Sequence, residues 1–493
     1  MAARNYLAFD LGASSGRAIL GTLDGGRLAI RELTRFDNPI IELVGHLHWD
    51  VAHLYQCVKA GMRACAIEAG VRPESVGVDT WGVDCALLAA DGSLVSLPYS
   101  YRDLRTQGAP EEFFRKVPAA RVYELTGIQV MPINTLFQLY VVARDRWPLL
   151  PAADALLMMP DLMNYFLTGV KRTEFTIATT TQLYNPRRGD WEPELLEAVG
   201  LPRSLMQQVV PPGTRIGELR APIAQEVGLD NLPVLATASH DTAAAVAAAP
   251  AEGNDWAYVS SGTWSLVGIE SRTPIITEQA RKANLTNEGG VEGTFRVLKN
   301  VSGLWLVQEC RRAWARDRDY SYAELASMAT EGQAFRSLVD PDWEGFMAPP
   351  DMPAAIQAFC ERAGQPAPET PAQFVRCVLE SLALKYRVVL DQLRRVSPTP
   401  INRLHIIGGG SQNQALSQFA ASATGLPVVC GPMEATAIGN LLVQAMGMEE
   451  LASLAELRAV VRASFPLREY EPQDAQAWDA AYDRFLELLQ SLS

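Results

Sequence analysis

The feature that most constrains the fold is a strand, a glycine turn and a second strand, which occur once in each half of the chain. Near the start, YLAFDLGASSGRAILGTL predicts strands over 6–9 and 18–23 around a Gly/Ser turn over 12–16. Much later, AYVSSGTWSLVGIE has the same order, with strands over 257–259 and 265–269 around a Ser-Ser-Gly-Thr turn. This repetition predicts two halves that share one plan.

The two halves are predicted to meet near residue 250. An alanine-rich run over 243–249 leads into Pro250, Gly253 and Asn254, a change in composition typical of a domain boundary. We therefore divide the chain into an N-terminal domain, 1–249, and a C-terminal domain, 250–493. The length agrees, because 493 residues at about 150 per domain predict two or three domains.

Strand and helix patterns alternate within both halves. Apolar residues at steps of three and four predict one helix over 50–69, ended by Gly70. A capping-box start at Thr370, followed by a similar apolar stripe to Leu393, predicts a long core-facing helix. The last part predicts strands over 404–407 and 427–430, a helix from 411 to just before 425, and another beyond 434. Such alternation predicts an α/β fold with mixed sheets flanked by helices.

Charge and composition exclude several classes of protein. The net charge of −13 repels a phosphate backbone, so nucleic acid is not expected as a partner. No apolar stretch reaches the roughly 18 residues of a membrane span, and Asp10 interrupts the first apolar run before a signal-peptide core could form. Seven scattered cysteines without a C-x-x-C pair suit a reducing compartment, although Cys360 and Cys377 could pair. We expect a soluble, cytoplasmic protein of unknown oligomeric state.

Three glycine-rich turns, over 12–16, 260–263 and 408–410, each follow a predicted strand. Backbone N–H groups in such turns can hold phosphate oxygens, because glycine has no side chain in the way. One such turn is weak support, but three across both halves favour a bound nucleotide. The chain lacks G-x-x-x-x-G-K-[ST] and G-x-G-x-x-G, which argues against a P-loop enzyme and against a nicotinamide-dependent oxidoreductase.

Two aspartates stand out beside these turns. Asp10 ends the first predicted strand, where it could face a Mg²⁺-bound nucleotide or only cap its own turn. Asp241 lies in the polar segment Ser239-His240-Asp241-Thr242 within an otherwise apolar run. A carboxylate so placed is either partnered in the core or exposed at a site, and we favour the site.

Seven segments together resemble the FGGY carbohydrate kinases. They are DLGASSGR, DTWGVD, YRDLRT, SHDTA, SSGTWS, GGGSQN and EATAIGN, and their order and spacing cover nearly the whole chain. The resemblance implies two actin-like, ribonuclease-H-like domains, with sugar and ATP in a cleft between them. It implies that 1–249 is the sugar-binding domain and 250–493 the nucleotide-binding domain.

The same resemblance implies the site residues. Asp241 matches the catalytic base, and Asp10 lies near Mg²⁺. The sugar is expected to contact Gly82, His240, Asp241, Thr242 and Asn300. ATP is expected to contact Ala13, Ser14, Ser15, Gly16, Arg17, Thr263, Gln308, Gly408, Gly409 and Gly410.

Within the family, SHDTA, SSGTWSL and NEGG followed by RVLKN look most like the rhamnulokinase subfamily. This predicts phosphorylation of L-rhamnulose at O1 by ATP, in deoxy-sugar breakdown. A kinase for another ketose, such as L-fuculose or xylulose, and a non-catalytic actin-like ATP-binding sensor are the alternatives. For Trp81 and Trp264, contact with the sugar and core packing are equally supported. For Arg102, Asp103 and Arg105, contact with the sugar and pairing with one another in a solvated loop are equally supported.

Overall fold

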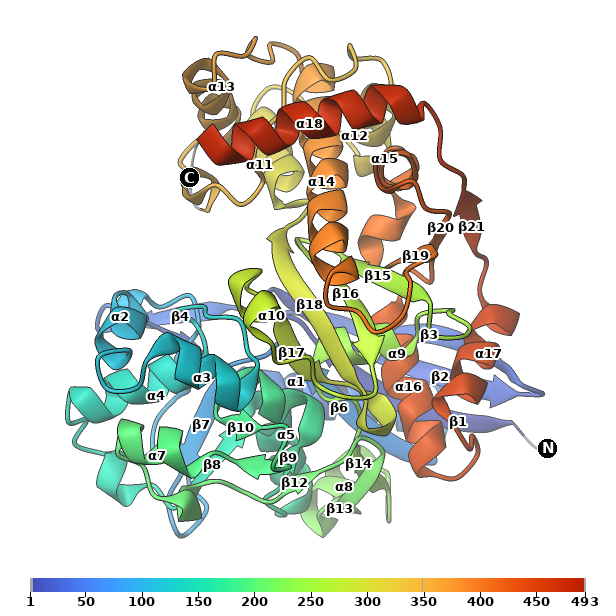
Figure 1. Ribbon diagram of the computed structural model, residues 1–493. Helices are drawn as coiled ribbons and strands as arrows, with labels where there is room; N and C mark the ends of the chain where they lie inside the picture. Colours follow the sequence, from blue (N-terminus) through green and yellow to red (C-terminus); the bar gives the residue numbers. More distant parts are fainter. Residues whose placement is uncertain (1–2, 348, 492–493) are drawn as a thin grey trace. The chain divides into compact units, whose positions relative to one another are not determined.

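The structure is a computed structural model that describes residues 3–347 and 349–491 (Figure 1). The chain forms two compact units. Unit 1 comprises Met1–Ala248, Glu270–Val297 and Ala435–Ser464, and unit 2 comprises Ala249–Ile269, Leu298–Glu434 and Phe465–Ser493. The chain first leaves unit 1 between Ala248 and Ala249, but two later segments return to it. The division into a sugar domain 1–249 and a nucleotide domain 250–493 stays a prediction.

The main sheet of unit 1 has six strands in the order β13-β14-β6-β1-β2-β3. It is mixed, because β6 pairs parallel with β1 and β14, whereas β1-β2, β2-β3 and β13-β14 are antiparallel. The strands are β1 (Arg4–Leu11), β2 (Ser15–Asp24), β3 (Arg27–Asp37), β6 (Ser75–Thr80), β13 (Thr214–Glu218) and β14 (Pro233–Ala236).

A second sheet follows the order β17-β18-β16-β15-β19-β20-β21. Here β15 pairs parallel with β19 and β19 with β20, while β15-β16 and β20-β21 are antiparallel. The strands are β15 (Trp256–Ser261), β16 (Trp264–Ser271), β17 (Thr286–Gly289), β18 (Phe295–Ser302), β19 (Arg403–Ile407), β20 (Val428–Cys430) and β21 (Arg468–Tyr470).

Apart from β17, an additional strand at the edge of the second sheet, the two sheets share one strand order, which confirms the prediction of a repeated plan. In each sheet three strands lie side by side in chain order, β1-β2-β3 and β15-β16-β18. Two further strands then add next to the first one, β6 and β14 in unit 1 and β19 and β20 in the second sheet. Each sheet also carries an antiparallel strand beyond these, β13 or β21. The predicted mixed sheets are thus confirmed.

Helices from distant parts of the sequence cover the sheet of unit 1. α16 packs on β1 and β6, and α17 packs on β3 (Figure 1). Close packing needs small residues here, because a Cβ on Gly439 of α16 would lie 1.8 Å from the carbonyl oxygen of Ala244 in α9. The helices of this layer are α1 (Val51–Arg63), α5 (Met159–Thr168), α8 (Ala221–Val227), α9 (Asp241–Ala247), α16 (Ala435–Gly447) and α17 (Leu454–Ser464).

A second hydrophobic core of unit 1 lies under short helices and two-stranded sheets. The helices are α2 (Ala109–Phe113), α3 (Ala119–Thr126), α4 (Thr135–Arg144), α6 (Phe175–Ala178) and α7 (Pro193–Val199), and unit 1 also contains α10 (Glu278–Lys282). The paired strands of unit 1 are β4 (Ile40–Leu43) with β5 (His46–Trp49), β7 (Cys85–Leu88) with β8 (Ala155–Met158), β9 (Thr173–Glu174) with β12 (Val209–Val210), and β10 (Tyr184–Asn185) with β11 (Asp190–Trp191).

The longest helix, α14 (Pro371–Arg394), lies in unit 2 beside α15 and α18 (Figure 1). The predicted apolar stripe is buried from Val375 to Leu393. The predicted capping box forms only in part: Thr370 accepts from the N–H of Gln373, but the Gln373 side chain accepts from Glu369 instead. The other helices of this unit are α11 (Trp305–Trp314), α12 (Tyr322–Met328), α13 (Met352–Arg362), α15 (Gln414–Thr424) and α18 (Ala475–Ser491).

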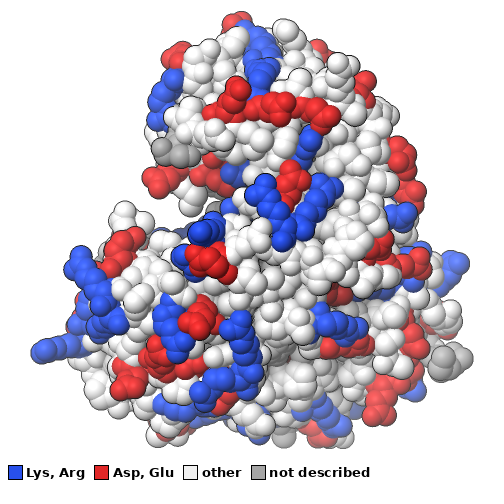
Figure 2. All heavy atoms as spheres, in the orientation of Figure 1, with Lys and Arg blue, Asp and Glu red and all other residues white. Residues whose placement is uncertain are grey.

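Three further predictions, on one helix, on the cysteines and on membrane spans, can be compared with the structure. The helix predicted over 50–69 is α1 followed by a π-helical turn, Ala64–Glu68. All seven cysteines are free, so Cys360 and Cys377 form no disulfide. None of the helices built from described residues is long and apolar enough to cross a membrane. On the face drawn in Figure 2, Lys and Arg side chains lie among Asp and Glu side chains.

Candidate active site

The first glycine turn tightly connects β1 to β2. The Gly12 N–H donates to the Ser15 carbonyl at 2.9 Å, and a Cβ on Gly12 would lie 3.2 Å from the same oxygen. Asn38 closes the turn from outside, with its backbone N–H on the Ser14 carbonyl and its side-chain amide on the Gly12 carbonyl. The turn therefore has a fixed shape, while Ala13 and Ser14 keep contact with solvent.

Two aspartates lie on neighbouring strands beside this turn. Asp10 of β1 stands in register with Asp79 of β6 and with Arg17 of β2. Arg17 Nη2 donates to Asp10 Oδ2 at 2.5 Å. The sequence left open whether Asp10 only caps its turn. Its partner is the Arg17 guanidinium, so a carboxylate and a guanidinium both lie at the predicted phosphate turn.

Asp79 is a site residue that sequence reasoning missed. Its side chain is fully buried, Asn440 Nδ2 donates to Oδ2 at 2.5 Å, and Oδ1 has no hydrogen-bond partner among the described residues. Burial and the neighbouring charge of Asp10 raise the pKa of Asp79 well above its usual range. Asp79 opens the quoted segment DTWGVD, but nothing in the sequence gives the register of β6 against β1.

Asp241 is the first residue of α9, and His240 precedes it as the N-cap. The Thr242 N–H donates to Asp241 Oδ1 at 2.6 Å, and His240 Nε2 lies 3.5 Å from the same oxygen. Oδ2 has no hydrogen-bond partner among the described residues, and 26% of the side chain is exposed. Burial raises the pKa of Asp241 to about 6, with His240 opposing and Asp10 adding to the rise. The structure therefore supports the site interpretation of this carboxylate.

Gly82 lies against the same histidine. A Cβ on Gly82 would come within 3.2 Å of His240 Nε2 and of Thr180 Cγ2, so a larger residue would press on the imidazole. Unit 1 thus brings together four of the five residues predicted to contact the sugar. The fifth, Asn300, lies on β18 in unit 2.

A buried arginine behind His240 also escaped sequence reasoning. Arg296 is fully buried, and its Nη2 lies 3.1 Å from His240 Nδ1 and 3.0 Å from Glu288 Oε2. Its Nη1 donates to Thr242 Oγ1 at 2.8 Å, and its Nε donates to the Gly289 carbonyl at 2.9 Å. Burial would raise the pKa of Glu288, but Arg296 and His240 bring it down to about 2. The segment RVLKN contains Arg296, yet a strand arginine gives no signal of burial.

Asp84, the second acidic residue of DTWGVD, holds a buried aromatic pair. Its Oδ2 accepts from Trp49 Nε1 at 2.6 Å and from Trp81 Nε1 at 2.9 Å, and the two rings lie 4.2 Å apart. Burial raises the pKa of Asp84 to about 6, although these hydrogen bonds lower it. Trp81 is only 5% exposed, so the structure favours core packing for Trp81. By contrast, Trp264 is 39% exposed at the second turn.

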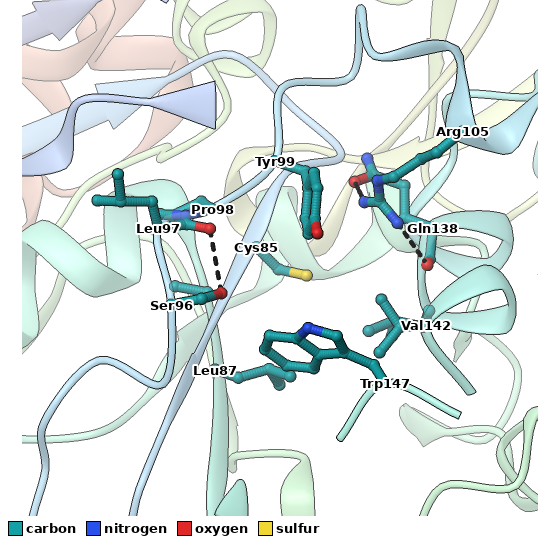
Figure 3. Close-up of a pocket in the computed structure, with 12 residues that line it drawn as sticks. Cys85, Leu87, Ser96, Leu97, Pro98, Tyr99, Arg105, Gln138, Val142 and Trp147 are labelled. Atoms are coloured by element: carbon teal, nitrogen blue, oxygen red, sulfur yellow. Dashed lines mark hydrogen bonds between the residues drawn. The ribbon is translucent and has the colours of Figure 1, made fainter. Parts of the chain in front are cut away.

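The loop after this segment is held by its own contacts. Arg105 donates to the backbone carbonyl and to Oε1 of Gln138, and its guanidinium lies over the Tyr99 ring (Figure 3). A cavity of about 30 Å³ lies between these side chains, Cys85 and Trp147. Such a volume holds a water molecule or two rather than a sugar. The structural interpretation of Arg105 is therefore the one that its contacts support.

The second glycine turn, between β15 and β16, lies in unit 2. The Gly262 N–H donates to the Trp264 carbonyl at 2.8 Å, and the carbonyl of Thr263 accepts from the N–H groups of Gly303 and Trp305. Thr263 Oγ1 donates to Gln308 Oε1 of α11 at 3.2 Å. Two residues predicted to contact ATP are thus direct partners.

The third glycine turn packs against the end of β15. A Cβ on Gly410 would lie 2.0 Å from Ser261 Oγ, and one on Gly408, which has φ +82°, would lie 3.0 Å from the Ser261 carbonyl oxygen. A Cβ on Gly409 would meet nothing within 4 Å. Gly408 and Gly410 therefore serve the close approach of two backbones, whereas Gly409 faces open space.

The acidic groups of unit 1 suit a magnesium ion that is held mostly through phosphate and water. Within the described residues, no group of three or more acidic, His or Cys side chains could enclose a metal ion. Magnesium commonly binds one or two carboxylates, with nucleotide phosphates and waters completing its octahedron. Asp10 provides such a carboxylate at the first glycine turn, in register with Asp79 on the adjacent strand.

Comparison with known proteins places this geometry in a family. Residues 5–247 match the N-terminal domain of the FGGY family of carbohydrate kinases, and residues 257–448 match its C-terminal domain. A rhamnulokinase from Bacteroides thetaiotaomicron is 50% identical, covering 98% of this chain and 99% of that protein. Rhamnulokinases from Pectobacterium carotovorum and Bacillus subtilis are 42% and 40% identical, covering 99% and 95% of this chain and 97% and 96% of those proteins.

Solved structures agree on the fold. A gluconate kinase from Lactobacillus acidophilus superposes with a TM-score of 0.84 at 15% identity, covering 100% of this chain and 98% of that chain. A xylulose kinase from Rhodospirillum rubrum gives 0.81 at 20% identity, covering 99% of each chain. The fold is the two-domain, actin-like and ribonuclease-H-like fold of sugar kinases, with mixed sheets flanked by helices. The chain therefore belongs to the FGGY family of carbohydrate kinases, and it is a sugar kinase.

Proposed function

We propose that this kinase transfers the γ-phosphoryl group of ATP to O1 of L-rhamnulose, giving L-rhamnulose 1-phosphate and ADP. The observation that carries the proposal is Asp241, a partly exposed carboxylate of raised pKa between His240 and Thr242. The substrate is suggested by the relatives named rhamnulokinase, which are 40–50% identical over nearly the whole chain. ATP as donor and seven free thiols favour the cytoplasm.

Asp241 is the base in this proposal. Phosphoryl transfer depends mainly on positioning and on neutralising charge, so the acceptor needs an orienting group more than a strong base. Oδ1 is occupied by the Thr242 N–H, which leaves Oδ2 to accept a hydrogen bond from the sugar hydroxyl. As the bond from oxygen to phosphorus forms, the hydroxyl proton passes to Oδ2 and ADP leaves. His240, Thr242, Gly82 and Asn300 would hold the rest of the sugar.

The nucleotide would be held by the three glycine turns. Ala13, Ser14, Ser15, Gly16 and Arg17 offer backbone N–H groups, hydroxyls and one guanidinium to the phosphates, and Thr263 offers a hydroxyl. Gly408, Gly409 and Gly410 would lie against adenosine, with Gln308 on the nucleotide side. Mg²⁺, when bound near Asp10, would neutralise phosphate charge.

Two alternatives to this proposal, a kinase for another ketose and a non-catalytic ATP-binding sensor, can be distinguished by measuring ADP release. A kinase for L-fuculose or xylulose would keep the chemistry and change the sugar, whereas a sensor would bind ATP without turnover. Asp241 argues against the sensor, because a protein that only binds nucleotide needs no base for an acceptor hydroxyl.

The test is ADP release by the purified chain with Mg-ATP, first without sugar and then with a panel of acceptors. The panel holds L-rhamnulose, L-fuculose, D-xylulose, L-ribulose and glycerol, compared by kcat/KM. We expect the highest value with L-rhamnulose. A higher value with another ketose would replace the substrate, and ATP binding without turnover of any sugar would favour the sensor.

A further inference from the structure

The guanidinium of Arg296 contacts four groups, and these contacts connect it to the residues proposed to bind the sugar. This side chain is completely buried, and its donors are directed at four different acceptors: the Gly289 carbonyl, Thr242 Oγ1, Glu288 Oε2 and the imidazole of His240. Two of these acceptors belong to side chains in the segment that contains Asp241. The arginine therefore lies directly behind the face that would meet the sugar.

The contacts of His240 select one protonation form. An arginine cannot accept a hydrogen bond, so the 3.1 Å contact from Arg296 Nη2 requires a lone pair on His240 Nδ1. The proton of the neutral ring then lies on Nε2, whose acceptors within reach are Thr242 Oγ1 at 3.2 Å and Asp241 Oδ1 at 3.5 Å. The opposite tautomer would turn an Nδ1–H toward a guanidinium and a bare nitrogen toward a carboxylate. Glu288 Oε2 lies farther from Nδ1, at 3.3 Å, than Arg296 Nη2 does, and it accepts from the same Nη2 at 3.0 Å.

Glu288 provides the negative charge that makes burial of the Arg296 guanidinium possible. A buried guanidinium without a counter-charge is strongly unfavourable, and Glu288 supplies that charge from the same layer. The planar, forked donor set also explains why this residue is an arginine. A lysine carries one ammonium on a flexible stem and cannot reach four divergent acceptors at once.

We propose that Arg296 and Glu288 form a positioning pair, which fixes His240 as the Nε2–H tautomer and orients Thr242, and thereby sets the affinity for the sugar. The pair does not touch the reacting atoms. The Nε2–H of His240 then faces Asp241 Oδ1, which helps to hold the carboxylate that would meet the sugar. The inference rests on the proposed function only in that the ligand is a sugar.

The first test is kinetic and uses whichever sugar the wild-type chain prefers. Arg296→Met is expected to raise the KM for sugar about 10- to 100-fold, with the KM for ATP changed less than about twofold. Arg296→Lys, which restores the charge but not the fork, is expected to recover only part of the loss. Glu288→Gln is expected to raise the sugar KM as well, because it leaves the guanidinium without its counter-charge.

A matched control exists in the same unit. Arg458 is also buried and makes a bidentate ion pair with Glu270, at 2.9 and 2.8 Å, and its Nη2 donates to the Val246 carbonyl near the end of α9 opposite to Asp241. Arg458→Lys weakens a buried ion pair in the same way and is expected to leave the sugar KM unchanged in the folded fraction. A rise in sugar KM equal to that of Arg296→Lys would mean general destabilisation and would overturn the proposal.

The second test needs no variant of the pair and no activity. Nitrogen-15 spectra of imidazole side chains distinguish the two neutral tautomers, and the His240 signal is assigned by its loss in His240→Gln. We expect Nε2 protonated and Nδ1 unprotonated near neutral pH. An Nδ1–H tautomer or a doubly protonated ring would overturn the proposal. A chain that phosphorylates no sugar would instead refute the proposed function, and this measurement would still stand.

Discussion

At Asp241, the burial that suits the carboxylate to its task also sets an acid limit on activity. Burial raises the pKa of this group to about 6, and a base accepts a proton only when it is ionised. Activity is therefore expected to be lost as the pH falls through about 6 and to be constant well above it. The check is kcat/KM for the sugar between about pH 5 and 8. An acid limb near the usual aspartate pKa would contradict the assignment.

Removing the same carboxylate separates its chemistry from binding. Asp241→Asn keeps the size of the side chain but cannot accept the hydroxyl proton, so kcat is expected to fall roughly 10²- to 10⁴-fold. ATP binding, measured by calorimetry, is expected to persist. Asp24→Asn, at an exposed position of β2, is the control for removing one negative charge. Equal turnover by Asp241→Asn and the control would exclude Asp241 as the base.

Single residues also show where sequence reasoning ended. Asp241 could be singled out because a charge within an apolar run is unusual. Asp79 and Arg296 could not, because their roles depend on contacts with Asn440, far along the chain, and with His240. A buried charge is recognised by its partners, and the partners come together only in the folded chain.

At the scale of elements, the third glycine turn separates a structural glycine from one that is proposed to meet a ligand. Gly410→Ala would place a Cβ 2.0 Å from Ser261 Oγ, so about 1–3 kcal/mol of stability is expected to be lost, together with affinity for ATP. At Gly409 a Cβ meets nothing within 4 Å, so Gly409→Ala is expected to keep wild-type stability. Gly409→Leu is expected to raise the KM for ATP more than that for sugar.

Urea unfolding and the two KM values check this set of variants. Gly409→Ala serves as the control for Gly410→Ala, since both add one methyl group to the same turn. If Gly409→Leu weakened only sugar binding, the turn would not be the adenosine site. If Gly410→Ala were as stable as Gly409→Ala, the close approach to Ser261 would not be needed for the fold.

Elements with strong local patterns could be predicted well. The apolar stripe and Thr370 predicted α14, and both lie where expected. The turn from α1 into a π-helical segment could not be predicted, because the apolar spacing continues across it. The same holds for the Gln373 side chain, which accepts from Glu369 instead of completing the capping box. Local sequence patterns therefore predict where an element lies. The hydrogen bonds at its ends depend on which of several possible donors and acceptors pair in the folded chain.

At the scale of the whole molecule, the repeated strand order could be predicted but the path of the chain could not. The alanine-rich run near residue 250 does mark the first passage between units, at Ala248 and Ala249. Nothing in the composition shows that Ala435–Ser464 returns to unit 1, where α16 packs on β1 and β6. Such a return is fixed by tertiary fit, for example the contact of Gly439 with Ala244.

This path leads to a prediction about how each ligand stabilises the molecule. A ligand that binds only the native state protects the segments it contacts from opening. The sugar alone is expected to slow amide hydrogen exchange over 79–84 and 240–242, which lie in unit 1. ADP alone is expected to slow exchange over 12–17 in unit 1 and over 261–264 and 408–412 in unit 2. Exchange followed by mass spectrometry, with glycerol as a control for an unrelated polyol, measures both patterns. Protection of 408–412 by sugar without nucleotide would contradict the assignment of that turn to adenosine.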